Sequence, residues 1–167
     1  MVHDTSMAAY IPPNLMHPVG GTWTYVAGLV AGTIALHRAA HNSTGVVNIP
    51  VVIPSNASAL KGSLLKSIEI DFEIATQVVT SAEALIYKVT RGANLGVADP
   101  GSALAMTYSP AYTETLKVEQ HKLVLTLTTP IWLLNTEYVL VEFSIVAGAG
   151  GGTQKILGAV ANYTARM

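Results

Sequence analysis

The sequence predicts an all-β protein, an antiparallel β-sandwich of the jelly-roll type with about eight strands. Runs rich in Val, Ile, Leu and Thr recur at short spacing, and Gly, Pro, Asn and Ser separate them. Hardly any segment has a helical period, which leaves strands as the main element. Sandwiches and jelly rolls consist of many short strands joined by turns of this kind. At 167 residues the chain has the length of one domain.

The first sixty residues are almost free of charge, since Asp4 and Arg38 are their only charged side chains. We expect residues 1–21 to form an extended N-terminal arm and residues 22–167 to form a single sandwich domain. Pro12, Pro13 and Pro18 suit an extended segment better than a packed element. A surface without charges is poorly solvated, so this segment is expected to be buried between subunits or in lipid.

Residues 19–36 leave two interpretations open, because they form an uncharged run of eighteen residues. That length is near the minimum for a membrane-spanning helix, and Gly28 and Gly32 match a small-xxx-small packing motif. The glycines and threonines of this run dilute its hydrophobicity, and no Lys or Arg cluster flanks it. Punctuated runs of this kind are more typical of strands, so no membrane span is favoured.

Several segments after residue 44 are predicted to be strands. Residues 45–53 contain Pro50 and therefore belong at a sheet edge or a bulge. Residues 57–65 hint at a short helix that Gly62 weakens. Apolar and acidic residues alternate without a fault over residues 68–74, which indicates one buried and one wet face.

Beyond these, residues 85–89 continue in the same style, and residues 123–128 and 139–146 are expected to be central strands. A long loop is predicted between Arg91 and Tyr112, as a candidate interface. The glycine run 148–152 follows a strand and predicts a hairpin connection. It is not a dinucleotide fingerprint, because the chain has no room after it for a helix, a strand and an acidic residue.

Composition excludes several classes of protein. Half of the residues are apolar and only 11% are charged, with a net charge of −1 and a mean hydropathy of +0.43. A nearly neutral chain offers no electrostatic footprint for nucleic acid, and its hydropathy excludes disorder. The absence of cysteine removes disulfides and thiolate chemistry. No motif singles out a nucleophile or a carboxylate pair, so neither an enzyme nor a cofactor is predicted.

Two groups of side chains are weak metal candidates. Glu69, Asp71 and Glu73 lie on one face of a strand, about 7 Å apart, and could contribute to a calcium site. The alternative is a solvated face paired across strands with Lys88 or Lys117. His37 and His41 have a spacing that suits metals on a helix, but the local pattern predicts a strand ending in a turn.

From about residue 60 to residue 166, the order of features resembles phage and virus-like surface proteins of the jelly-roll type. The resemblance implies a capsid, decoration, tail or fibre subunit without catalytic residues to carry over. The first sixty residues lie outside it. The segments that carry it are Leu60-Lys61-Gly62, Ala84-Leu85-Ile86-Tyr87-Lys88, His121-Lys122-Leu123, Thr129-Pro130, Asn135 to Glu142 and Ile156 to Thr164.

The charge-poor segment and the resemblance together predict a non-enzymatic structural subunit of a repetitive assembly, most simply a virion. Its partners would be copies of itself, as a trimer or larger, and other virion proteins. We expect it in a virion or another extracellular assembly, made in the cytoplasm without a signal peptide, because residues 1–7 lack Lys and Arg. The predicted assembly interface comprises Tyr10, Ile11, Leu15, Trp23, Tyr25, Tyr108 and Tyr112.

The alternative function is a β-sandwich binding module for carbohydrate or a cell-surface partner. Aromatic side chains could serve as stacking platforms, since their rings offer large apolar faces. The candidates are Trp23, Trp132, Tyr108 and Tyr112.

Overall fold

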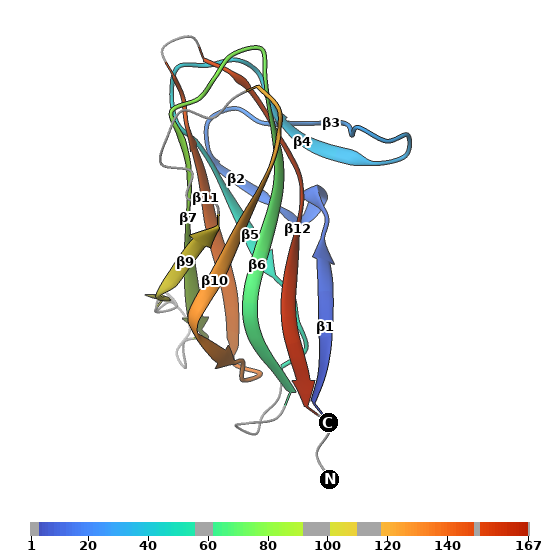
Figure 1. Cartoon of the computed structure of the whole chain (residues 1–167), viewed down its shortest axis with the longest axis vertical. Helices are drawn as coiled ribbons and strands as arrows, with labels where there is room; N and C mark the ends of the chain where they lie inside the picture. Colours follow the sequence, from blue (N-terminus) through green and yellow to red (C-terminus); the bar gives the residue numbers. More distant parts are fainter. Residues whose placement is uncertain (1–3, 56–61, 92–100, 110–117, 149–150, 167) are drawn as a thin grey trace.

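The computed structural model describes residues 4–55, 62–91, 101–109, 118–148 and 151–166. These residues form twelve strands and one short 3-10 helix, η1 (Pro13–Leu15). The strands make two antiparallel sheets that pack face to face (Figure 1). The prediction of an antiparallel jelly-roll sandwich is confirmed.

The larger sheet has seven strands. Six of them follow the order β3-β4-β12-β6-β10-β9, and the seventh, β1, pairs with residues 159–166 of β12, after the part of β12 that pairs with β4. The long strands β6, β10 and β12 form its centre, and β6 pairs with both of the others over most of its length. The strands are β1 (Asp4–Ile11), β3 (Thr24–Ala27), β4 (Ile34–Arg38), β6 (Gly62–Ala75), β9 (Met106–Ser109), β10 (Gln120–Trp132) and β12 (Thr153–Arg166).

The smaller sheet has five strands in the order β2-β5-β11-β7-β8. β11 lies at its centre, as expected for residues 139–146. In this described sheet, β2 pairs only with residues 46–48 of β5, so Pro50 of β5 has no ladder partner on that side and is locally at an edge. The strands are β2 (His17–Gly20), β5 (Gly45–Val51), β7 (Ser81–Thr90), β8 (Gly101–Ala103) and β11 (Glu137–Val146).

The core lies between the two sheets. It consists of the apolar side chains that point inward from the strands. Ile68, Ile70, Phe72 and Ile74 of β6 are fully buried, as their period of two predicts. The ring of Phe72 meets that of Phe143 from the other sheet at 5.2 Å between centroids, so the aromatic side chains join the layers.

Several local predictions were wrong. The described strands number twelve rather than about eight, because short strands that lack a clear pattern join the sheet edges. The predicted loop from residue 91 to residue 112 contains β8 and β9. The glycine run connects β11 to β12, which lie in different sheets, so it crosses the sandwich rather than closing a hairpin. Residues 62–65 begin β6, and the rest of the hinted helix lies outside the described residues.

The N-terminal segment also differs from the expectation of an extended arm. All eight residues of β1 pair with β12 of the same chain. Ile11 is buried at 2% exposure and belongs to the core. Residues 4–20 are therefore built into the sandwich through β1, η1 and β2. Many of their backbone N–H and C=O groups form hydrogen bonds within the same chain.

Residues 19–36 contain the end of β2, all of β3 and the beginning of β4, so the favoured interpretation as strands is confirmed. β3 and β4 pair in a hairpin that reaches out from the side of the sandwich (Figure 1). The hairpin joins the sheet through residues 36–38 of β4, which pair with β12. Within the described part of the chain, no helix has the length and apolar character needed to cross a membrane.

Candidate functional site

The outer face of the seven-stranded sheet, turned away from the core, carries most of the charged side chains of the strands. Glu69, Asp71 and Glu73 of β6 point outward because they alternate with the buried isoleucines and Phe72. The register brings Lys122 of β10 opposite Asp71, and Gly158 of β12 opposite Asp71 on the other side. Charged side chains of β6 and β10 therefore meet on this surface, which we call the outer face.

An irregularity in β12 positions an exposed aromatic ring beside this patch. The register between β12 and β6 shifts between Ile156 and Gly158, so Leu157 is an extra residue in a β-bulge. The hydroxyl of Tyr10 on β1 donates a hydrogen bond of 3.0 Å to the carbonyl oxygen of Leu157. Gly158 makes room for the ring, because a Cβ at that position would lie 2.6 Å from the phenol oxygen. The Tyr10 side chain remains 62% exposed.

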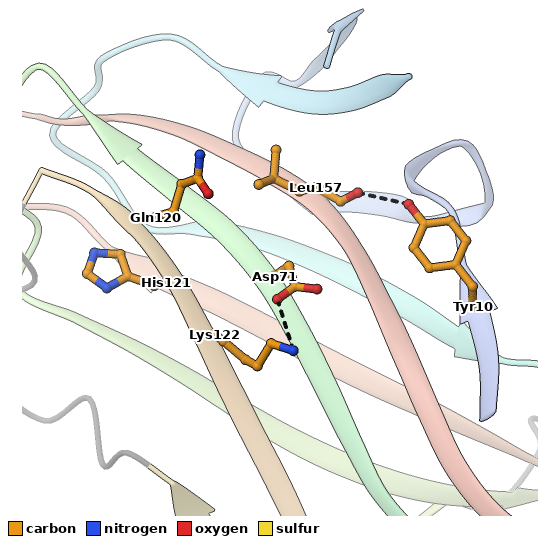
Figure 2. A pocket seen from close by; sticks show the side chains of 6 residues that line it. All are labelled: Tyr10, Asp71, Gln120, His121, Lys122 and Leu157. Atoms are coloured by element: carbon orange, nitrogen blue, oxygen red, sulfur yellow. Dashed lines mark hydrogen bonds and ion pairs between the residues drawn. The ribbon is translucent and has the colours of Figure 1, made fainter. Parts of the chain in front are cut away.

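Tyr10 forms one side of an open pocket of about 410 Å³ (Figure 2). Asp71 and Lys122 project into it from β6 and β10, and Gln120 and Leu157 complete its upper part. A volume of this size falls in the range of small-molecule sites. His121 also borders the pocket, but its ring stacks on buried Phe72 at 5.2 Å between centroids.

Hydrogen bonds across three strands hold the polar side chains below the pocket. The ammonium of Lys122 lies 2.8 Å from one carboxylate oxygen of Glu69 and 3.8 Å from Asp71. The amide of Asn162 on β12 donates to the other oxygen of Glu69 at 2.9 Å. The hydrogen bonds from Lys122 and Asn162 hold the pKa of Glu69 below its usual range, and the bond to Glu69 raises the pKa of Lys122. Both groups therefore stay ionised at neutral pH.

The acidic row is paired across strands and only partly exposed, and its partners differ from those predicted. Lys122 pairs with Glu69 and Asp71, and Lys155 lies 3.2 Å from Glu73. Lys88 instead pairs with Glu137 of the other sheet at 2.9 Å. The other predicted partner, Lys117, lies outside the described residues. Among the residues that are described, no group of three or more His, Asp or Glu side chains could hold a metal ion, so the calcium candidate at this row gains no support.

The described residues of the predicted assembly interface lie in different surroundings. Tyr10 belongs to the pocket, whereas Ile11 is in the core. Leu15 and Tyr25 are exposed at 44% and 53%. Tyr108 is 37% exposed, and its hydroxyl donates to the carbonyl of Ala84. Tyr112 lies outside the described residues.

The two tryptophans are poor stacking platforms. Trp23 packs against the core and donates from Nε1 to the carbonyl of Gly20 at 2.8 Å. The guanidinium of Arg166 lies over the ring of Trp132, 4.9 Å from its centroid. Asp4 in turn holds Arg166 through two hydrogen bonds of 2.7 and 2.9 Å. Tyr10, in contrast, presents an exposed aromatic ring next to polar side chains.

Sequence reasoning named Tyr10 and Asp71 for other roles and missed Gln120, Lys122 and Leu157 as members of a pocket. The pocket depends on the pairing of β1 with β12 and on the bulge at Leu157. Neither is visible in a local pattern, since the contact between Tyr10 and Leu157 joins residues 147 positions apart in the chain. Gly158 within an otherwise regular strand pattern was the one available signal, because an isolated glycine in a strand suggests a bulge.

No family model matches this chain, and no curated protein matches it. Among solved structures, it is similar to the CBM22-1 xylan-binding domain of Paenibacillus barcinonensis Xyn10C, with 9% identity, a TM-score of 0.47 and coverage of 93% of this chain and 92% of that one. A native family 35 carbohydrate binding module from Clostridium thermocellum has 13% identity, a TM-score of 0.39 and coverage of 93% and 97%.

A conserved carbohydrate esterase from the Shiga toxin-encoding bacteriophage phi24B also matches, with 13% identity, a TM-score of 0.39 and coverage of 90% of each chain. These comparisons show no phage structural family. Identities and TM-scores at this level are too low to transfer a ligand or an activity to this chain.

Proposed function

We propose that this chain is a non-catalytic β-sandwich module that binds carbohydrate at the pocket beside Tyr10. One observation carries the proposal: an exposed phenol ring borders a pocket that also contains a carboxylate, an amide and an ammonium group. A sugar ring has apolar C–H faces and hydroxyl edges. The ring of Tyr10 can cover an apolar face of the sugar. Asp71, Gln120 and Lys122 can form hydrogen bonds with its hydroxyl groups.

The pocket is organised before a ligand arrives, which favours binding. Tyr10 is held by its bond to Leu157, and Lys122 is held by Glu69 and Asp71. Side chains that are already fixed lose little conformational entropy when a ligand binds. Asp71, Lys122 and Leu157 lie on β6, β10 and β12, the long central strands of the sheet, so the backbone on this side of the site is fixed as well.

The electrostatics of the outer face favour binding over catalysis. Acid catalysis of glycoside cleavage needs a carboxyl group whose pKa is raised, so that it holds a proton near neutral pH. The pKa of Glu69 is instead lowered by Lys122 and Asn162. Lysines also lie against Asp71 and Glu73, with nitrogen–oxygen distances of 3.8 and 3.2 Å.

The proposal is tested by glycan-array screening of the wild type, followed by calorimetric titration of the best ligand. Tyr10→Ala should weaken binding by at least about tenfold, because it removes the central contact surface. Tyr138→Ala is the matched control, since Tyr138 is 44% exposed on the other sheet. Absence of binding by the wild type, or equal losses in the two variants, would contradict the proposal.

We also propose a second function, a subunit of a repetitive assembly, because the β3–β4 hairpin is apolar and exposed. Tyr25, Leu29, Val30 and Ile34 are between 48% and 67% exposed. No charged residue occurs from residue 5 to residue 37, so two copies could pack hairpins together without like-charge repulsion. Apolar surface of this kind favours contact with another protein.

The oligomeric state tests this second function directly. Light scattering on the wild type should show a mass above the 17.5 kDa of a single chain. Val30→Lys should shift the protein toward the monomer, because it places a charge at the hairpin tip. Val52→Lys is the matched control, since Val52 is similarly exposed at 68% but lies outside the hairpin. A wild type that stays monomeric at high concentration would refute it.

A further inference from the structure

Arg38 at the end of β4 is a buried cation with no anionic partner among the described residues. Its side chain is among the largest fully enclosed ones in the described part of the chain, and the residue is 2% exposed. Nη1 donates to the carbonyl of Ser43 at 2.8 Å and to Oε1 of Gln154 at 3.4 Å, and Nη2 donates to Oγ of Ser43 at 2.8 Å. All three acceptors are neutral. Nε finds no hydrogen-bond partner within the described ranges.

No carboxylate among the described residues therefore balances the positive charge of this guanidinium. Burial disfavours its charge and lowers the pKa of Arg38, yet an arginine stays protonated in a protein. The chain contains no Asp or Glu from residue 5 to residue 68. On the neighbouring strand, Lys155 lies opposite His37 and already holds Glu73 at 3.2 Å. No described carboxylate forms an ion pair with Arg38.

A small pocket of about 170 Å³ is lined in part by Arg38. Gly21 lies next to the unpartnered nitrogen, since a Cβ there would come within 2.5 Å of Nε. His41 accepts a hydrogen bond from the backbone N–H of Ser43 on Nδ1 at 3.1 Å, so a neutral His41 ring carries its proton on Nε2 and can donate. The pocket is lined by Thr22, Thr24, His37, Arg38, Ala39, Ala40 and His41.

We propose that this pocket binds the carboxylate of an acidic sugar. The negative charge supplies a counter-charge for Arg38, and low-dielectric protein transmits the attraction over several ångströms without direct contact. Two threonines and two histidines line the space, and their polar groups suit the hydroxyls of a sugar ring. The pocket is smaller than the sites of drug-sized ligands, so it takes one sugar unit or the end of a chain.

This site is separate from the pocket at Tyr10, and the two can be tested independently. Glucuronate and glucose are the probes, because they differ only in a carboxylate in place of a hydroxymethyl group. Glucuronate should raise the melting temperature of the wild type at millimolar concentration and bind about tenfold more tightly than glucose. The difference should shrink with added salt, since screening weakens charge attraction.

Thr22→Asp tests the site by building a carboxylate into it. This variant should melt a few degrees above the wild type, because the new carboxylate would neutralise Arg38, and it should lose the response to glucuronate. Thr107→Asp is the control, since Thr107 is an exposed threonine on β9, at the opposite edge of the sheet. Tyr10→Ala should keep the glucuronate response even if it loses all other glycan binding. Equal responses to the two sugars, or an unchanged response in Thr22→Asp, would overturn the proposal.

Discussion

The outer face of the larger sheet and the β3–β4 hairpin show two opposite ways of exposing a strand to water. On the outer face, Lys122 and Lys155 pair with carboxylates across neighbouring strands, and Tyr10 is tied to the bulge of β12. In the hairpin, β4 is the one described strand that pairs with β3, and the exposed side chains are uncharged. The first surface is held rigid by contacts among four strands, which suits ligand recognition. The second is supported mainly at its base, which suits contact with a partner that covers it.

The following changes test this comparison, and they are ordered by their expected effect on the free energy of unfolding. Gly158→Val should have the largest effect. Gly158 has a φ of +154°, and a Cβ would collide with the ring of Tyr10. We expect a loss of about 1–3 kcal/mol in urea unfolding together with loss of glycan binding. A variant that unfolds and binds like the wild type would show that the bulge does not position Tyr10.

Glu69→Ala should destabilise the protein by about 0.5–1 kcal/mol, because it removes the bonds to Lys122 and Asn162 from partly exposed groups. A double-mutant cycle with Lys122→Ala in urea unfolding measures the coupling between the two. Glu83→Ala is the control, since Glu83 is exposed on β7 and its carboxylate accepts a hydrogen bond from the neutral hydroxyl of Ser81. Equal losses at Glu69 and Glu83 would mean that the outer face is no better fixed than other surface.

Acid should weaken the same contacts without mutation. The pKa of Glu69 is lowered in the folded protein, mainly by the hydrogen bond from Lys122. Its contribution to stability is therefore present above the unfolded value of about 4.5 and is lost as the pH falls below it through the folded pKa. Urea unfolding between pH 6 and pH 3 should show a fall that is smaller in Glu69→Gln. If the free energy of unfolding falls equally in the wild type and in Glu69→Gln, carboxylates other than Glu69 cause the loss of stability.

Val30→Lys should have the smallest effect on folding. Val30 is 67% exposed at the hairpin turn, so the free energy of unfolding of the isolated chain should change by less than about 0.5 kcal/mol. The measurement is urea unfolding at a concentration where light scattering shows a monomer. A loss comparable to that of Gly158→Val would show that the hairpin packs onto the body of the sandwich.

Parts of the fold followed from local patterns because their physical cause is local. The alternation over residues 68–74 predicted one buried and one wet face of β6, and the residues of the core confirm it. β11 was expected to be central from its β-branched and aromatic residues, and it lies between β5 and β7. The position of Pro50 at a local sheet edge followed from its missing N–H.

The segments that the patterns described wrongly are those whose structure depends on a distant partner. β1 has no clear alternation of burial, and its pairing with β12 joins the two ends of the chain. Local propensity carries no information about such a partner, so the segment resembled an arm. The short strands β8 and β9 were missed for the same reason, since they are defined by the long strands beside them.

The sequence by itself determined the all-β class, the wet row of Glu69, Asp71 and Glu73, and the uncharged segment that became the hairpin. Periodicity and charge decide these features, and both can be counted along the chain. Only the tertiary structure decided that the ring of Tyr10 stands beside Asp71 and that Arg38 is enclosed among neutral acceptors. Strand pairing brings distant residues to one surface, and burial depends on every neighbour at once, so both sites arise with the folded sheets.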